Sequence, residues 1–364
     1  MLEKIRAATA ANRTFFFGIV FFLIANLGVG VGLVLFPDMP YMLYMFCLYV
    51  PAIVGFGSVS LVFTIHHKKT LPAENPIRAS QVLKVIPLVL CGNLAMLPIN
   101  MLSMIINERV WGPQFLESAN SVPMPTSTGL LLVSIVLFAL LPAVFEEWLF
   151  RGILQRANTP NLGKWVPLYT AVAFGLMHSN LITNWSLIVI GWIISMLMYR
   201  TGSLKLCMWY HFLHNTFALS LGFLSNKMLE MWGEHTEVSV PIAEQVGVGS
   251  MVIYFVVGIG AFFGAWFLLK SMQIDKGAPM DPARKMNERR SMPPQWVAPV
   301  LYLSEEEQKR ILPEGNREIN GGLYPPNNQP RLFERVNYVW YGLALGVLLG
   351  LALLTAVLMK FSQM

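Results

Sequence analysis

Long apolar runs, separated by short polar, charged or proline-rich connections, dominate the pattern of this chain. At about 1.5 Å of rise per residue, a helical run of about 20 residues crosses the hydrocarbon core of a bilayer. The runs lie at residues 14–36, 41–65, 81–106, from 128 onward, 165–178, 185–199, 206–224, 248–269 and 337–359. The pattern therefore predicts an all-α fold, a polytopic transmembrane helix bundle of about nine spans.

The basic residues predict the topology of this bundle. Lys4, Arg6 and Arg13 precede the first run, and Lys68 and Lys69 follow the second. Because loops on the cytoplasmic side carry an excess of lysine and arginine, we expect the N-terminus inside and the C-terminus outside. The first run is too long for a signal-peptide core and lacks a small-residue cleavage site, so we expect it to be retained as a span.

The order of spans and polar segments divides the chain into five predicted parts. These are the N-terminal spans and loops (1–126), a core helical bundle (127–224), an outer acidic loop with the eighth span (225–272), a soluble cytoplasmic segment (273–335) and a C-terminal span (336–364).

Two of these parts carry local signals. In the soluble segment, Ser304 and Glu307 have the spacing of a capping box that opens a short helix. In the last span, Gly342, Gly346 and Gly350 form a ridge of small residues that lets another helix approach closely, within the chain or from a second copy. Of the two, we expect packing against a helix of the same chain.

The third run carries helix breakers of its own, Pro87, Gly92, Asn93 and Pro98. Breakers at that density predict a kink or a cavity, which is tolerated where neighbouring helices satisfy the freed backbone groups.

Composition agrees with a membrane protein and excludes other classes. The 364 residues are 55% hydrophobic and only 13% charged, and the mean hydropathy is +0.55. The basic residues behind the net charge of +6 cluster beside apolar runs, where topology and anionic lipid explain them, so we expect no nucleic-acid partner. Cys47, Cys91 and Cys207 lie in separate apolar stretches, which indicates small core residues rather than a disulfide framework or a metal cage.

Three ionisable residues follow the apolar run 130–144, and ionisable groups at membrane depth indicate function. Glu147 and Arg151 have i,i+4 spacing with the acid first, which favours an intrahelical ion pair. Glu146 lies about 100° around the same helix and has no partner in its own segment. It must pair with another helix or bind something, which makes it a candidate general base. The alternative is a structural salt bridge that locks two helices together.

Two later runs carry further polar residues. His178 shares a helical face with Phe174, and His211 shares one with Asn215, whereas His214 lies about 60° off that face and is expected to be structural. A free acid, two histidines and an asparagine on separate spans resemble a catalytic site. Such a set could activate a water through Glu146, aided by imidazole or by a divalent metal such as zinc, with the asparagine donating to an oxyanion.

The three motifs Glu-Glu-x-x-x-Arg, Phe-x-x-x-His and His-x-x-x-Asn, in this order on successive spans, resemble the motif set of the CPBP family, also called Abi. This family includes the type II CAAX prenyl endopeptidases and bacteriocin-processing or immunity proteins, and the resemblance covers about residues 128–224. It implies hydrolysis of a peptide bond inside the membrane, at a site that opens toward the cytoplasm. The roles implied are Glu146 as base, Glu147 and Arg151 as its support, His178 and His211 as holders of the water or, with Glu146, of a metal, and Asn215 as oxyanion donor.

The sequence does not decide between lipidated, leader-bearing and membrane-protein substrates. The charge pattern favours a bacterial plasma membrane. Two other functions are alternatives. Buried Glu, His and Arg also mark ion or proton paths in transporters, but the outer halves of the spans are mostly apolar. A non-catalytic immunity or binding protein could keep the same architecture.

The sequence has no His-Glu-x-x-His or Gly-x-Ser-x-Gly motif, and Asp38, Asp275 and Asp281 lie outside the apolar runs, which argues against other intramembrane protease types.

Overall fold

Helices make up almost all of the structured chain. The computed structural model describes residues 2–36, 38–67, 71, 74–112, 125–178, 184–232, 247–272 and 337–362, and these residues contain no strand. The main elements in chain order are α1 (Leu2–Leu35), α2 (Tyr41–Ala52), η1 (Ile53–Gly57), α3 (Ser58–His67), α4 (Ala79–Trp111), α6 (Thr128–Ser134), η3 (Ile135–Leu140), α7 (Leu141–Glu147), η4 (Trp148–Gln155), α8 (Arg156–Leu162), η5 (Gly163–Trp165), α9 (Val166–Met177), α10 (Asn184–Thr201), α11 (Leu204–Trp232), α13 (Val248–Ser271) and α16 (Val339–Ser362). The all-α prediction is confirmed.

Six helical segments among the described residues are long and apolar enough to cross a membrane, so the chain is an integral multi-pass membrane protein. They lie at Ile5–Leu35, Leu43–His67, Ala79–Trp111, Thr128–Met177, Gly249–Ser271 and Val339–Val357. The continuous segment from Thr128 to Met177 contains two of the runs counted in the sequence. The number of nine spans stays a prediction.

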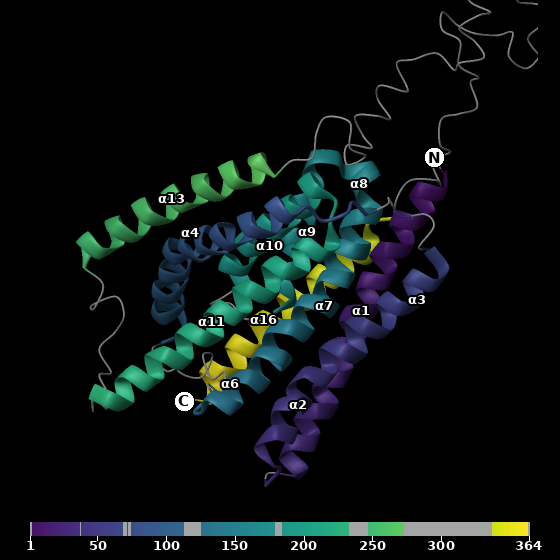
Figure 1. The fold of residues 1–364 in the computed structure, drawn as a ribbon. Helices are drawn as coiled ribbons and strands as arrows, with labels where there is room; N and C mark the ends of the chain where they lie inside the picture. Colours follow the sequence, from purple (N-terminus) through teal and green to yellow (C-terminus); the bar gives the residue numbers. More distant parts are fainter. Residues whose placement is uncertain are drawn as a thin grey trace, which may run out of the picture.

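The N-terminal hairpin consists of α1 and the antiparallel unit α2, η1 and α3, on one side of the bundle (Figure 1). Helix α1 begins at Leu2, well before the apolar run at residue 14. The reason is local, because the intervening stretch is rich in alanine, the best helix former, and Ala8 and Ala11 are fully buried. The two arms of the hairpin pack closely at Gly55, where an added Cβ would lie 2.7 Å from the Phe22 backbone.

Helix α4 runs without a break from Ala79 to Trp111, past the expected end at residue 106, and has Pro87 and Pro98 in its interior. Figure 1 shows the bend that the sequence predicts for this segment. Helix α13 packs closely on it, since a Cβ at Gly258 would lie 2.5 Å from the Pro98 ring. The predicted kink is confirmed.

The segment that carries the three ionisable residues is longer than expected. The sequence places Glu146 near the end of its span, but helical structure continues through η4 and α8 to Leu162. Sixteen further residues correspond to about 24 Å of helix beyond Glu146. Two wider π-helical stretches, η3 and η4, interrupt the α-helix on either side of α7. Such interruptions are frequent at functional sites.

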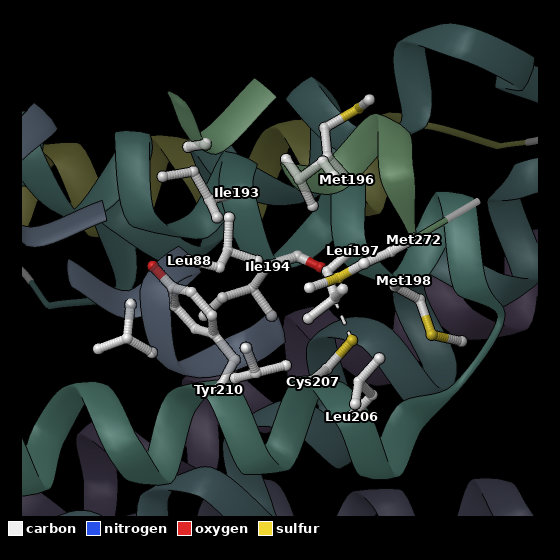
Figure 2. Close-up of a cluster of buried hydrophobic side chains, with 14 of the residues drawn as sticks. Leu88, Ile193, Ile194, Met196, Leu197, Met198, Leu206, Cys207, Tyr210 and Met272 are labelled. Carbon is white, nitrogen blue, oxygen red and sulfur yellow. Dashed lines mark hydrogen bonds between the residues drawn. The ribbon is translucent and has the colours of Figure 1, made fainter. Parts of the chain in front are cut away.

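One hydrophobic core joins α4, α10, α11 and α13 (Figure 2). Tyr210 and Cys207 of α11 face Ile194 of α10 there, and the Cys207 Sγ lies 3.7 Å from the Ile194 carbonyl oxygen. Cys207 is therefore the core residue that was predicted. Cys47 and Cys91 are half-buried free thiols.

Helix α16 packs against α1 and α9, but not through its glycines. The face that packs carries Ala344, Leu348, Ala352 and Ala356, each at most 1% exposed. The glycines lie about 200° from these positions around the helix. A Cβ at Gly342, Gly346 or Gly350 would meet nothing within 4 Å. The prediction that the glycine ridge packs against a helix of the same chain is therefore wrong for the residues that the structure describes.

The acidic region after residue 224 is in part helical. Helix α11 continues to Trp232, so Glu230 lies on a helix rather than in a loop, and its Oε2 is 2.6 Å from the Lys227 Nζ. The remaining glutamates of the predicted outer loop, Glu234, Glu237 and Glu244, lie outside the described residues. The same holds for the segment 273–335 with its predicted capping box.

Candidate active site

Glu147 lies at the centre of a buried polar group formed by α7, η4 and α11. Its Oε1 accepts from the Nη1 of Arg151 at 2.8 Å and lies 2.8 Å from the Nδ1 of His211. Glu147 and Arg151 are both fully buried, and His211 is 4% exposed. The i,i+4 ion pair predicted from the spacing is present in the structure.

The contact between Glu147 and His211 joins two helices that are 64 residues apart in sequence. An ionised carboxylate can only accept hydrogen bonds, so beside it the His211 Nδ1 carries the proton. The other ring nitrogen, Nε2, is then the one available to a second group. The resemblance assigns Glu147 to the support of Glu146, whereas in this structure its Oε1 orients an imidazole.

Arg151 reaches a third helix. Its Nη2 donates to the carbonyl oxygen of Gly191 in α10 at 2.9 Å, and one turn further on the Nε2 of Gln155 donates to the Ser195 carbonyl at 2.7 Å. Both acceptors are small residues at i,i+4 spacing, which lets the backbones approach closely. Sequence reasoning did not identify Gln155 or Gly191, although Gln155 shares the helical face of Glu147 and Arg151 and could have been found from that spacing.

The ring of Phe174 contacts three polar side chains. The Arg151 guanidinium carbon lies 4.5 Å from the ring centroid, a cation–π geometry. The rings of His178 and His211 approach edge-on at centroid distances of 5.2 and 5.7 Å. The two predicted histidines therefore lie on the same phenylalanine, even though α9 and α11 are not neighbours in sequence.

His178 follows the last residue of α9, and its Nδ1 lies 3.1 Å from the Phe174 carbonyl oxygen. It is exposed, in contrast to His211. The sequence placed His178 about 20 Å across the membrane from the inner surface, far from Glu146. This difficulty disappears because helical structure continues for sixteen residues past Glu146 before the turn into α9, so Glu146 does not lie near the end of its helix.

Asn215 contacts the segment before Glu146. Its Nδ2 donates to the carbonyl oxygen of Phe138 at 3.2 Å. Phe138 precedes Pro142 by four residues, and proline has no N–H for the usual i to i−4 bond. Pro142 therefore cannot donate to this carbonyl, which accepts from the side chain on α11. The Asn215 amide has two N–H groups, so this contact leaves one for another acceptor.

Glu146 is 8% exposed, and its Oε2 is buried with no hydrogen-bond partner among the described residues. Two neighbouring polar atoms, Glu147 Oε2 and Arg151 Nε, are likewise buried and unpaired there. Electrostatic interactions connect Glu146 with Glu147, Arg151 and His211. Unpaired buried polar atoms are uncommon in folded proteins, and a bound water, an ion or a catalytic role can account for them.

His214 lies beside this group but is oriented differently. It is 7% exposed, and its ring stacks on Tyr210 at a centroid distance of 6.3 Å. Its Nδ1 has no hydrogen-bond partner within the described part of the chain. The packing on a core tyrosine agrees with the structural role that we expect from its position on the helix.

The predicted metal set consists of Glu146, His178 and His211. Across the described ranges, no three His, Cys, Asp or Glu side chains are grouped closely enough to hold a metal ion. The residues present thus do not form a ready metal site, and we derive no catalytic step through a metal. The divalent metal stays a prediction from the sequence.

Comparison with known proteins adds one finding. Residues 128–217, about a quarter of the chain, match the family described as type II CAAX prenyl endopeptidase Rce1-like. No curated protein and no solved structure matches the chain. All six candidate site residues fall within the matched segment. The resemblance to this protease family, which the motifs predict, is thus confirmed over residues 128–217.

Proposed function

We propose that this membrane protein is an intramembrane endopeptidase that hydrolyses a peptide bond with a water activated by Glu146. The coarse class follows from the matched domain, since that family is a protease family. The observation that supports the finer proposal is the division between two adjacent carboxylates. The Oε1 of Glu147 binds Arg151 and His211, whereas the Glu146 side chain has no hydrogen bond or ion pair among the described residues.

This division assigns different tasks to the two acids. A general base must be free to take a proton from water, and Glu146 is the acid that fits. Glu147 instead holds His211 in a fixed orientation, as the carboxylate of a hydrolytic triad holds its histidine. Arg151 fixes Glu147 in turn through the ion pair and the bond to Gly191.

The proposed reaction has two steps. Glu146 takes a proton from water while the water oxygen attacks the carbonyl carbon of the peptide bond, which gives a tetrahedral oxyanion. The free N–H of Asn215 and the His211 side chain stabilise the negative charge. The carbon–nitrogen bond then breaks, and the proton held by Glu146 passes to the leaving amine, so that an acid and an amine are released.

The proposed substrate is a peptide close to a bilayer, because Glu146, Glu147 and Arg151 lie in a helical segment that is long and apolar enough to cross a membrane. Lipidated C-terminal tails, leader peptides and membrane-protein segments all meet this description. We propose cleavage on the cytoplasmic side and a bacterial plasma membrane on the basis of the charge pattern alone.

The test is cleavage of a pooled library of membrane-proximal and lipidated peptides by the purified protein in liposomes, with mass spectrometry of the products. The wild type is compared with Glu146→Gln, each with and without a chelator. Product formation by the wild type that is lost in Glu146→Gln supports the proposal, and the chelator arm separates a metal-held water from a glutamate mechanism. Equal cleavage by both proteins refutes the role of Glu146.

Absence of cleavage by either protein would favour one of the alternatives. Proton or metal flux into the same liposomes that depends on Glu146 would indicate a transporter. If flux is absent as well, a non-catalytic immunity or binding protein is the function that the result supports.

A further inference from the structure

Tyr49 of α2 lies near the proposed base but outside the matched domain, in the N-terminal hairpin. Its side chain is 5% exposed and belongs to the hydrophobic cluster that also contains Phe150 and Phe174. Helix α2 contacts both η3 and α7, the two segments that lead to Glu146. Tyr49 is thus held by packing against the elements that position Glu146.

The hydroxyl of Tyr49 is buried and has no hydrogen-bond partner among the described residues. The same holds for the Oε2 of Glu146. Helix α2, which carries Tyr49, contacts α7, which carries Glu146, and an electrostatic effect of Glu146 on this hydroxyl agrees with that packing. A donor and an acceptor that are both unpaired therefore lie in one buried region.

Leaving a hydroxyl or a carboxylate unpaired in the interior is expensive, and the two groups can satisfy each other. A tyrosine O–H is a donor, and a carboxylate oxygen is an acceptor. The two groups are not hydrogen-bonded to each other in the structure. One bridging water can join them, since a water in a polar buried space bonds two or more such groups.

From these observations we propose that Tyr49 is a positioning residue for Glu146, and that the Tyr49 hydroxyl acts on Glu146 Oε2 through a hydrogen-bonded bridging water. The inference rests on the proposed function, in which Glu146 is the general base. The bond fixes one carboxylate oxygen and leaves the other directed at the reacting water. The N-terminal hairpin would thus complete a site whose other residues all lie within 128–217.

The experiment uses Tyr49→Phe in the full chain, because this change removes the hydroxyl and keeps the ring that packs in the core. The matched control is Tyr210→Phe, since Tyr210 is also fully buried with an unpaired hydroxyl but belongs to the other core. Two quantities are measured for each variant. The first is kcat and KM on a cleaved peptide, and the second is the infrared carboxylate band of Glu146, identified by its loss in Glu146→Gln.

We expect Tyr49→Phe to lower kcat about tenfold or more with KM unchanged within about twofold, because a hydrogen bond to a charged group is lost. The Glu146 band shifts in Tyr49→Phe and stays in place in Tyr210→Phe. Wild-type kcat in Tyr49→Phe would overturn the proposal. An unmoved Glu146 band would also overturn it, because a loss of kcat alone would then reflect packing.

The infrared measurement does not depend on peptide cleavage, so it tests the role of Tyr49 separately from the proposed protease function. If the wild type cleaves no peptide, the protease proposal fails, but a band shift in Tyr49→Phe still shows that Tyr49 positions Glu146, and an unmoved band refutes it. If Tyr49→Phe does not accumulate, fluorotyrosine at position 49 keeps the shape and makes the hydroxyl a stronger donor. A shifted Glu146 band then supports the bond, and an unshifted band contradicts it.

Discussion

Arg151 provides the sharpest test of how the buried polar group is held together. Arg151→Ala removes the 2.8 Å partner of Glu147 and the 2.9 Å donor to the Gly191 carbonyl. Because both charged side chains are fully buried, Glu147 would remain as a buried carboxylate with only His211 beside it. Removing one partner of a buried ion pair destabilises a protein by about 3–5 kcal/mol. The equilibrium constant for unfolding should rise by about two to four orders of magnitude.

The assay is equilibrium unfolding of the purified protein in mixed micelles with increasing denaturing detergent. The control is Lys227→Ala, because the Lys227–Glu230 pair has the same kind of contact, at 2.6 Å, with side chains that are 38% and 54% exposed. Exposed pairs contribute about 0–1 kcal/mol, so this variant should unfold like the wild type. Arg151→Lys should recover only part of the loss, because an ammonium does not span two acceptors as a guanidinium fork does. A free energy of unfolding within about 1 kcal/mol of the wild type for Arg151→Ala would refute the reasoning.

Two further predictions concern packing and the asparagine. Gly191→Ala should lower the free energy of unfolding by about 1–3 kcal/mol, because the new Cβ would lie 3.0 Å from the Phe174 ring. The control is Gly346→Ala, which should unfold no more easily than the wild type because its Cβ would meet nothing within 4 Å. Equal effects of the two substitutions in the same unfolding assay would contradict the packing described here. Asn215→Ala should lower kcat about 100-fold or more through loss of an oxyanion donor, while KM changes little. A raised KM with unchanged kcat on a cleaved peptide would assign Asn215 to substrate binding instead.

Local spacing predicted the parts of the site that lie on one helix. The i,i+4 positions of Glu147 and Arg151 were enough to predict their ion pair, and Phe174 and His178 share a face as expected. The rotation of Glu146 away from this face also indicated that it would lack a local partner. These features follow from helix geometry, which the sequence determines directly.

Contacts between helices were not predictable in the same way. The bond from His211 to Glu147 depends on how α11 packs across α7, and nothing in either helix alone specifies it. The contribution of Tyr49 likewise requires the N-terminal hairpin to lie against α7. Pairings of this kind depend on the packed faces of several helices, so they become visible only in the folded arrangement.

The hydropathy pattern located the apolar runs but not the ends of the helices. Helix α1 begins 12 residues before its apolar run, and helical structure continues past Glu146 to Leu162, because helices extend through polar residues that still favour helical backbone. The glycine ridge of α16 was misleading for a related reason. Glycine spacing shows that close approach is possible, but the alanine and leucine face of α16 makes the contact.

The central claim is that Glu146 activates the water that hydrolyses a peptide bond. The most direct measurement is the initial rate of cleavage of the best library peptide by wild type and by Glu146→Gln, in liposomes and at equal amounts of folded protein. Loss of a general base lowers the rate by about 10²–10⁴-fold, and the account predicts a loss in this range with normal thermal stability. A Glu146→Gln protein that cleaves the same peptide at the wild-type rate would contradict it.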